Sequence, residues 1–138
     1  MFKVLLLVNA FLTFAAFLLF FLAPQVLPSG VGAQIDPSAY FLGYMAGSAE
    51  LGIAIISFYA RKIVDVKLLS AICIANSAFH AFSVVAEILL ITSGRSTEPW
   101  SLWGNMALRI TLAALFAYYG YRFSIRKSIQ GMKIFEGL

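Results

Sequence analysis

The chain has 138 residues, of which 62% are hydrophobic and 12% are charged, and its mean hydropathy is +0.91. Soluble domains carry about 25% charged residues, so this composition excludes an ordinary soluble fold and predicts a protein that lies in a lipid bilayer. The formal net charge of +4 comes mainly from basic residues at the ends of apolar runs, where they set orientation in a membrane. We therefore expect no nucleic-acid partner.

Four apolar runs follow one another along the chain, and each is long enough for the hydrocarbon core, which about 20 helical residues cross. A membrane β-barrel would need segments of about 10 residues with alternating polarity, and the sequence has no such period. The predicted fold class is therefore all-α, an integral membrane four-helix bundle that forms a single domain over residues 1–138. The expected helices are 4–22, 39–60, 68–92 and 102–121, followed by a basic tail at 122–138.

The first 33 residues also have features of a cleaved signal peptide. Lys3 precedes the first apolar run, and residues 31–33 (Val-Gly-Ala) have the small side chains of a cleavage site. The apolar run is longer than the 7–15 residues of a signal peptide, and residues 31–33 lie about ten residues beyond its end. We expect this first segment to be retained as a transmembrane helix.

If the four helices alternate in direction, the basic residues separate onto two sides of the membrane. One side carries Lys3, Arg61, Lys62, Lys67, Arg122, Arg126, Lys127 and Lys133, and the other carries Arg95. Because Lys and Arg gather on the cytoplasmic side, both termini are expected in the cytoplasm, in a bacterial inner membrane or an equivalent one. In the tail, Ile125, Ile129 and Met132 recur at helical spacing, so this segment either lies along the inner leaflet or is solvated.

The third run has a polar face within its apolar sequence. Cys73, Asn76, His80, Ser83 and Glu87 follow one another at spacings of three and four residues, which places them on one stripe of an α-helix. A charged side chain at membrane depth costs at least about 2.5 kcal/mol unless it is shielded, so this stripe should face the interior of the bundle. The single cysteine has no partner for an intrachain disulfide.

The second run has a face of the same kind, which starts with small residues. Gly43, Gly47, Glu50, Ala54 and Ser57 share it, and the two glycines form a small-xxx-small pair. Such pairs let two helix backbones come close together in a membrane. We therefore expect a neighbouring helix to pack tightly against this face.

The other two helices each carry polar pairs one turn apart: Asn9 and Thr13 in the first run, Asn105 and Arg109 in the last. Counting from the outer boundary at about 1.5 Å per residue places the ionisable groups within about 10 Å of one another in depth. Arg109 is expected to pair first with Glu87, which lies closest in depth, and then with Glu50. His80 and Asn105 are expected to complete the hydrogen bonds of this cluster.

These polar side chains are candidates for a binding site, because apolar packing would hold the helices together at a lower desolvation cost. The predicted ligand-binding residues are Glu50, Asn76, His80, Glu87, Asn105 and Arg109. The expected ligand is a small lipophilic molecule such as a quinone or an isoprenoid or sterol-like lipid. Its apolar walls, or simply lipid-facing surface, are expected from Phe11, Phe14, Phe17, Phe79 and Phe82.

Other functions stay open at this point. The polar cluster suits a structural role in an accessory subunit of a larger membrane complex or a homo-oligomer, and a small transporter or membrane enzyme is a third possibility. His80 suits hydrogen bonding, ligand contact or proton relay better than haem or pigment ligation, since no second His or Met is clearly placed to match it. The sequence has no HExxH, CxxC or glycine-rich phosphate motif, so no catalytic or metal-binding residue is predicted and a non-enzymatic protein is favoured. Quinone, lipid and pigment all remain open as bound molecules.

Residues 47–53 (Gly-Ser-Ala-Glu-Leu-Gly-Ile) resemble the G-x-x-E-x-x-G helix of DoxX-like small membrane proteins, which are four-helix bundles of about this length. Here the second glycine, Gly52, comes earlier than in that pattern. The resemblance implies a bundle that is associated with quinone or redox partners, and Glu50 is the residue that it carries over.

Overall fold

The computed structural model describes the backbone of residues 1–30, 36–94 and 99–135, and the side chains of these residues as far as Ile125 except Leu27, Pro28, Pro99 and Ser101. All regular secondary structure in these residues is helical, which confirms the predicted all-α class. The long helices are α1 (Phe2–Leu22), α3 (Tyr40–Ala60), α4 (Val66–Thr92) and α5 (Pro99–Phe135), and the short elements are α2 (Val26–Gly30) and η1 (Pro37–Ala39).

Three segments of the described chain are long and apolar enough to cross a membrane: Phe2–Leu22, Pro37–Ala60 and Val66–Thr92. The fourth long helix, α5, has two strongly polar side chains, Asn105 and Arg109, within its apolar part. Together with the basic residues that follow Tyr121, they lower the average hydropathy of α5 below that of the other long helices.

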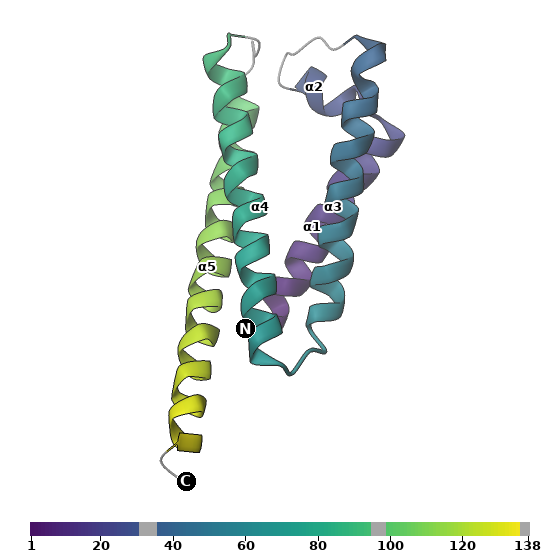
Figure 1. Cartoon of the computed structure of the whole chain (residues 1–138). Helices are drawn as coiled ribbons and strands as arrows, with labels where there is room; N and C mark the ends of the chain where they lie inside the picture. The colour runs from purple at the N-terminus through teal and green to yellow at the C-terminus, as the bar shows by residue number, and fades with distance from the viewer. Residues whose placement is uncertain (31–35, 95–98, 136–138) are drawn as a thin grey trace.

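The first three long helices begin and end within two residues of their predicted bounds, whereas α5 differs from prediction at both ends. It begins at Pro99 instead of residue 102 and continues to Phe135, beyond the predicted end at residue 121. Residues 122–130 contain neither glycine nor proline, so no helix breaker separates the membrane segment from the tail. The helix consequently projects past the turn that joins α3 to α4 (Figure 1).

Two aspartates cap the starts of helical elements, a position that short acidic side chains favour. The Asp36 carboxylate accepts the backbone N–H of Ser38 at 2.8 Å, ahead of η1 and α3, and hydrogen bonds from Ser38 lower the pKa of Asp36. The Asp65 carboxylate accepts the N–H of Lys67 at 2.7 Å at the start of α4. The possible cleavage site at residues 31–33, and the tail side chains beyond Ile125, lie outside the described residues.

The bundle consists of two helical hairpins, α1 with α3 and α4 with α5, which lie side by side (Figure 1). Gly47 marks the close contact within the first hairpin: a Cβ added there would lie 2.9 Å from Phe20 Cβ and 3.5 Å from the Phe17 carbonyl oxygen. This contact confirms the predicted close approach at the small-residue face of α3.

The second hairpin has a close contact of the same kind, which the sequence pattern had not indicated. A Cβ added at Gly120 in α5 would lie 3.3 Å from Cys73 Cβ in α4. Ser70 and Ser77 of α4 donate hydrogen bonds to backbone carbonyls of α5, at 3.0 and 2.9 Å. A small residue and serine hydroxyls therefore hold α4 and α5 close along their length.

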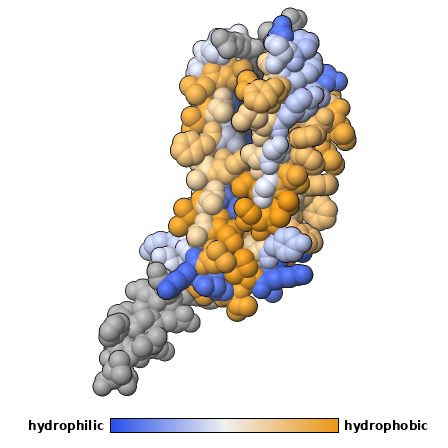
Figure 2. All heavy atoms as spheres, turned by 45° about the vertical axis from the view of Figure 1, so that its right-hand side comes forward, coloured by the Kyte–Doolittle hydropathy of each residue, from blue (hydrophilic) through white to orange (hydrophobic). Residues whose placement is uncertain are grey.

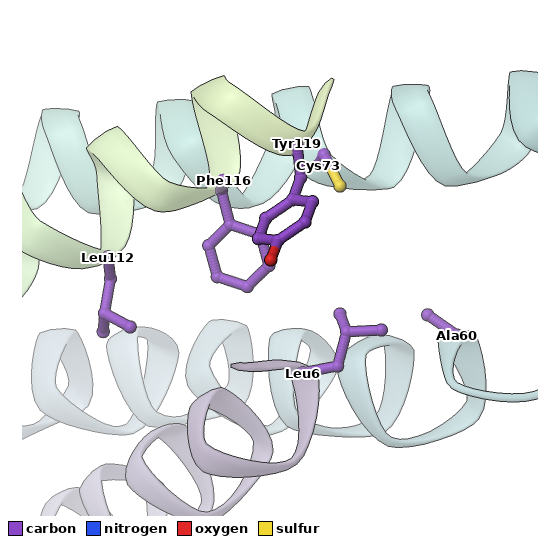
Figure 3. Packing of buried hydrophobic residues seen from close by; sticks show 6 residues of the cluster. All are labelled: Leu6, Ala60, Cys73, Leu112, Phe116 and Tyr119. Carbon is purple, nitrogen blue, oxygen red and sulfur yellow. The ribbon is translucent and has the colours of Figure 1, made fainter. Parts of the chain in front are cut away.

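The seam between the two hairpins has three successive layers of side chains. The apolar layer consists of Leu6, Ala60, Cys73, Leu112, Phe116 and Tyr119 (Figure 3). It starts at the end that carries the N-terminus and reaches as far as His80, on which Phe116 stacks. The amide layer comes next and consists of Asn9, Ser57, Asn76 and His80. The ionic layer follows and consists of Glu50, Ser83, Glu87, Asn105 and Arg109.

Candidate functional site

Helix α4 contributes to all three layers, because its polar stripe repeats every three or four residues and therefore keeps to one helix face. Cys73 lies in the apolar layer, Asn76 and His80 in the amide layer, and Ser83 and Glu87 in the ionic layer. The first three of these residues are buried and the last two are partly buried. The prediction that this stripe faces the bundle interior is confirmed.

The amide layer is a hydrogen-bond network centred on Asn9 of α1. Its side-chain amide donates to Ser57 Oγ of α3 at 2.9 Å and to Asn76 Oδ1 of α4 at 2.8 Å. Its Oδ1 lies 2.7 Å from His80 Nε2, and because an amide oxygen only accepts, the imidazole hydrogen is on Nε2. All four side chains are almost completely buried. Asn9 thus joins three helices across the seam.

His80 does not take part in the cluster of Arg109, contrary to the sequence expectation. It bonds to Asn9 and stacks on Phe116, with ring centroids 6.1 Å apart. Seven residues, or two helical turns of about 10 Å, separate His80 from Glu87 along α4, and helix boundaries counted from sequence do not resolve that difference. Asn76 likewise belongs to the amide layer, so two of the six predicted ligand-binding residues lie away from the ionic groups.

The ionic layer is arranged around the guanidinium of Arg109. Its Nη2 donates to Glu50 Oε1 at 2.9 Å, and its Nη1 donates to Ser83 Oγ at 3.1 Å. Its Nε lies 3.5 Å from Glu87 Oε1, an ion-pair distance that lacks hydrogen-bond geometry. Asn105, one turn from Arg109 on α5, donates to the same Glu87 oxygen. The expected cluster of Arg109 with both carboxylates is therefore present, and Asn105 completes it.

The order of the two ion pairs is the reverse of the prediction, since Glu50 and not Glu87 makes the closer contact with Arg109. Depth alone favoured Glu87, but the rotation of α3 places Glu50 on the seam, with only 5% of its side chain exposed. The Glu87 oxygen nearest to Arg109 is also shared with Asn105. The Arg109–Glu50 pair consequently connects the two hairpins, whereas the Arg109–Glu87 pair lies within one of them.

Several polar atoms of this region are buried without a hydrogen-bond partner. In the ionic layer they are Glu50 Oε2, Glu87 Oε2 and Arg109 Nε, and in the amide layer the one such atom is His80 Nδ1. Buried polar atoms of folded proteins are normally paired, and an unpaired one costs about 1–3 kcal/mol. The unpartnered atoms of the ionic layer can therefore form hydrogen bonds with a further polar group at membrane depth.

Asn9, Ser57 and Ser83 take part in these networks, although the sequence did not select them as ligand-binding residues. Asn9 is an asparagine in an otherwise apolar run, and Ser57 lies two turns from Glu50 on the same face of α3. Ser83 is on the polar stripe of α4. The sequence therefore shows that these residues lie on polar helix faces. Their hydrogen-bond partners depend on how the helices are rotated toward one another.

The phenylalanines are mostly outside the polar layers. Phe11 and Phe14 line an apolar groove of about 250 Å³ on the α1–α3 hairpin, and Phe82 is largely exposed. Phe79 lies beside the ionic layer, with its ring centroid 5.8 Å from Arg109 Cζ. The lipid-facing interpretation of these aromatic residues thus fits most of them.

In the described part of the chain, no group of three His, Cys, Asp or Glu side chains is placed to hold a metal ion. Comparison with models of known protein families, with curated proteins and with solved structures finds no match for this chain. The resemblance of residues 47–53 to DoxX-like proteins stays a prediction. In that segment Gly47 is the site of close helix packing, Glu50 is buried in the ionic layer, and a Cβ added at Gly52 would meet no atom within 4 Å.

Proposed function

We propose that this protein is an integral membrane four-helix bundle with both ends in the cytoplasm, and that it holds a small lipophilic ligand whose polar end lies at the ionic layer. Three helices suited to membrane crossing support the bundle, as does the packing of α5 along α4. The N-terminus and the α3–α4 turn share one end of the structure (Figure 1), where Figure 2 shows hydrophilic residues gathered. Lys3, Arg61, Lys62 and Lys67 belong to this end, so the positive-inside rule makes it cytoplasmic.

The observation that carries the ligand proposal is the set of unpartnered atoms on Glu50, Glu87 and Arg109. A cluster that served only to hold the helices would be expected to satisfy its own hydrogen bonds, as most of the amide layer does. A ligand with a polar head and an apolar body supplies the missing partners and keeps its remainder in contact with lipid-facing side chains.

Access to the ionic layer is also consistent with a ligand. The side chains of Arg109 and Glu87 are 15% and 13% exposed, and Asn105 is exposed. Figure 2 shows hydrophilic atoms recessed between columns of mostly hydrophobic side chains. A molecule that is dissolved in the bilayer would therefore reach the layer sideways, without passing through water.

Native mass spectrometry of the full chain, purified in a mild detergent, tests the ligand proposal. We expect the protein to retain a small molecule from the cell membrane and the variant Glu50→Leu/Arg109→Leu to lose it. This variant removes both members of the inter-hairpin pair, so the net charge of the ionic layer stays the same and Glu87 is its one remaining charged side chain. Thr13→Val is a matched control, since Thr13 is buried but bonds only to its own helix backbone. Absence of any retained molecule, or equal retention by the double variant, contradicts the proposal. A retained protein partner would instead favour a subunit of a larger complex.

The orientation has its own test with a membrane-impermeant amine reagent applied to intact cells. Lys3, Lys62 and Lys67 should not react from outside. Ser93→Lys places a lysine at the opposite end of the bundle, where it should react, and so serves as the positive control. Reaction of Lys62 or Lys67 from outside would reverse the proposed topology.

A further inference from the structure

The ionic layer has one basic and two acidic side chains. Glu50 comes from α3, Glu87 from α4 and Arg109 from α5, and the side chains that α1 brings to the neighbouring part of the seam, Asn9 and Thr13, are neutral. One guanidinium can balance one carboxylate. With both carboxylates ionised, the layer carries a net charge of −1.

His80 does not supply the missing positive charge. Its Nε2 donates to Asn9 in the amide layer, and its Nδ1 has no partner to accept a hydrogen from it. The neutral imidazole satisfies these contacts, whereas the protonated ring would bury a second N–H without an acceptor. His80 therefore adds no positive charge, and the balance is restored within the ionic layer either by a proton on one carboxylate or by a bound cation.

The unpartnered atoms of the ionic layer include more hydrogen-bond acceptors than donors, in line with its excess of negative charge. Arg109 Nε, the free donor, already lies near Glu87 Oε1, whereas Glu50 Oε2 and Glu87 Oε2 are two free carboxylate oxygens. A carbonyl, carboxylate or phosphate head would bring further acceptors to a place that already has an excess of them. A head that donates hydrogen bonds and carries positive charge corrects both imbalances at once.

From this arrangement we propose that the ligand of the ionic layer is a lipophilic amine in its cationic form, a primary or secondary ammonium group attached to an apolar body. This inference rests on the proposed function and narrows it to one class of ligand. The ammonium hydrogens bond to the free oxygens of Glu50 and Glu87. The other oxygen of Glu50 accepts from Arg109, and the other oxygen of Glu87 accepts from Asn105. The apolar body lies toward the bilayer, on the side where Arg109 and Glu87 are partly exposed.

The free carboxylate oxygens are themselves buried, so the ligand has to displace side chains at the seam to reach them. Among the described side chains, the polar contact between the hairpins at this level is the ion pair of Arg109 with Glu50. The tight backbone contacts at Gly47 and Gly120 lie within the hairpins. A small separation of the hairpins at the ionic layer would therefore leave the contacts within each hairpin intact.

Four probes that share a dodecyl chain separate the possible head groups: dodecylamine, dodecyltrimethylammonium, dodecanol and dodecanoate. Each is titrated into the purified full chain in mild detergent, and the bound fraction is measured by native mass spectrometry. We expect dodecylamine, protonated at neutral pH, to bind at least about tenfold more tightly than the other three, since one charge-assisted hydrogen bond is worth that factor.

Two variants tie the binding to the ionic layer. Glu87→Gln and Glu50→Gln keep the size of the side chain and remove its charge, and each should weaken dodecylamine binding at least about tenfold. The control, Asp36→Asn, makes the corresponding change at an exposed loop carboxylate and should have no effect. Circular dichroism and the melting temperature establish that a variant is folded, and either folded glutamine variant suffices for the comparison.

The possible outcomes distinguish this inference from the function on which it rests. If dodecanol or dodecanoate binds as tightly as dodecylamine and is weakened by the same variants, the amine proposal is overturned and a lipophilic-ligand site remains. Equal binding of dodecyltrimethylammonium overturns the requirement for N–H donors. If no probe binds and no molecule is retained from the cell, both proposals fail.

Discussion

The amide layer and the ionic layer are neighbours on the same seam, and they use polar side chains in different ways. In the amide layer, Asn9 uses both of its amide hydrogens and its oxygen on three partners that are almost completely buried. In the ionic layer, Glu50, Glu87 and Arg109 each keep a polar atom without a partner, and the last two are partly exposed.

This difference indicates a division of roles along the seam. Neutral amide and hydroxyl groups can satisfy one another in a dry interior at a modest desolvation cost, so the amide layer is suited to hold the hairpins in register. Charged groups cost more to bury. A buried set of charged groups whose hydrogen bonds are incomplete therefore contributes little to stability. Substitutions in the ionic layer should accordingly change ligand binding in a way that does not follow their effect on the free energy of unfolding.

The largest effect is expected from Arg109→Leu, which leaves two carboxylates without their cation. Breaking a buried ion pair by removal of one partner costs about 3–5 kcal/mol, and the second change Glu50→Leu should restore part of this loss. The free energy of unfolding, measured by denaturant titration in detergent micelles, gives the coupling energy of the double-mutant cycle.

The same cycle with Glu87→Leu should give a smaller coupling energy, because the Arg109–Glu87 contact is longer and Asn105 shares the Glu87 oxygen. Strict additivity of Arg109→Leu and Glu50→Leu would show that the two side chains do not form a specific pair. A larger coupling to Glu87 than to Glu50 would restore the order that the sequence suggested.

The tight contact at Gly47 lies outside both polar layers, so a substitution there measures the cost of overpacking alone. Gly47→Leu should destabilise the α1–α3 hairpin by about 1–3 kcal/mol, since the added side chain would meet Phe20 at its first carbon. Gly52→Leu in the same helix is the matched control, because a Cβ there meets no atom within 4 Å. An equal melting temperature for both variants would mean that Gly47 faces lipid instead of α1.

The amide layer should respond to Asn9→Leu by a loss of about 1–2 kcal/mol, as Ser57, Asn76 and His80 lose a shared partner. Retention of the small molecule by the folded variant should be unchanged, which would sharpen the contrast with the ionic layer. If Asn9→Leu abolished retention while the protein remained folded, the amide layer would belong to the binding site and the division of roles would be wrong.

The smallest effect is expected from Ser77→Ala, which removes one hydroxyl bond from α4 to the Ala113 carbonyl of α5. Interhelical hydrogen bonds in membrane proteins contribute about 0.6 kcal/mol on average, so the melting temperature should fall only slightly. A loss as large as that of Asn9→Leu would show that bonds within a hairpin matter as much as those across the seam.

The sequence alone determined the helices and their polar faces, because both depend on local properties of the chain. Apolar length predicted the long helices, and spacings of three and four residues placed Asn76, His80 and Glu87 on one inward face of α4. The same reasoning predicted the close packing at Gly47, since small residues one turn apart mark such contacts. The change in polarity near residue 121 predicts the end of the last helix, but polarity by itself does not end a helix, and α5 continues to Phe135.

The tertiary structure decided which polar groups meet. The estimated depths in the membrane place His80 with Arg109. The rotation and axial position of the helices instead divide the polar side chains into two layers, and His80 forms its hydrogen bond with Asn9. The preference of Arg109 for Glu50 over Glu87 likewise depends on how α3 is turned toward the seam and on competition from Asn105. Each of these partnerships joins residues far apart in the chain, so it follows from the relative placement of whole helices and not from the periodicity within any one of them.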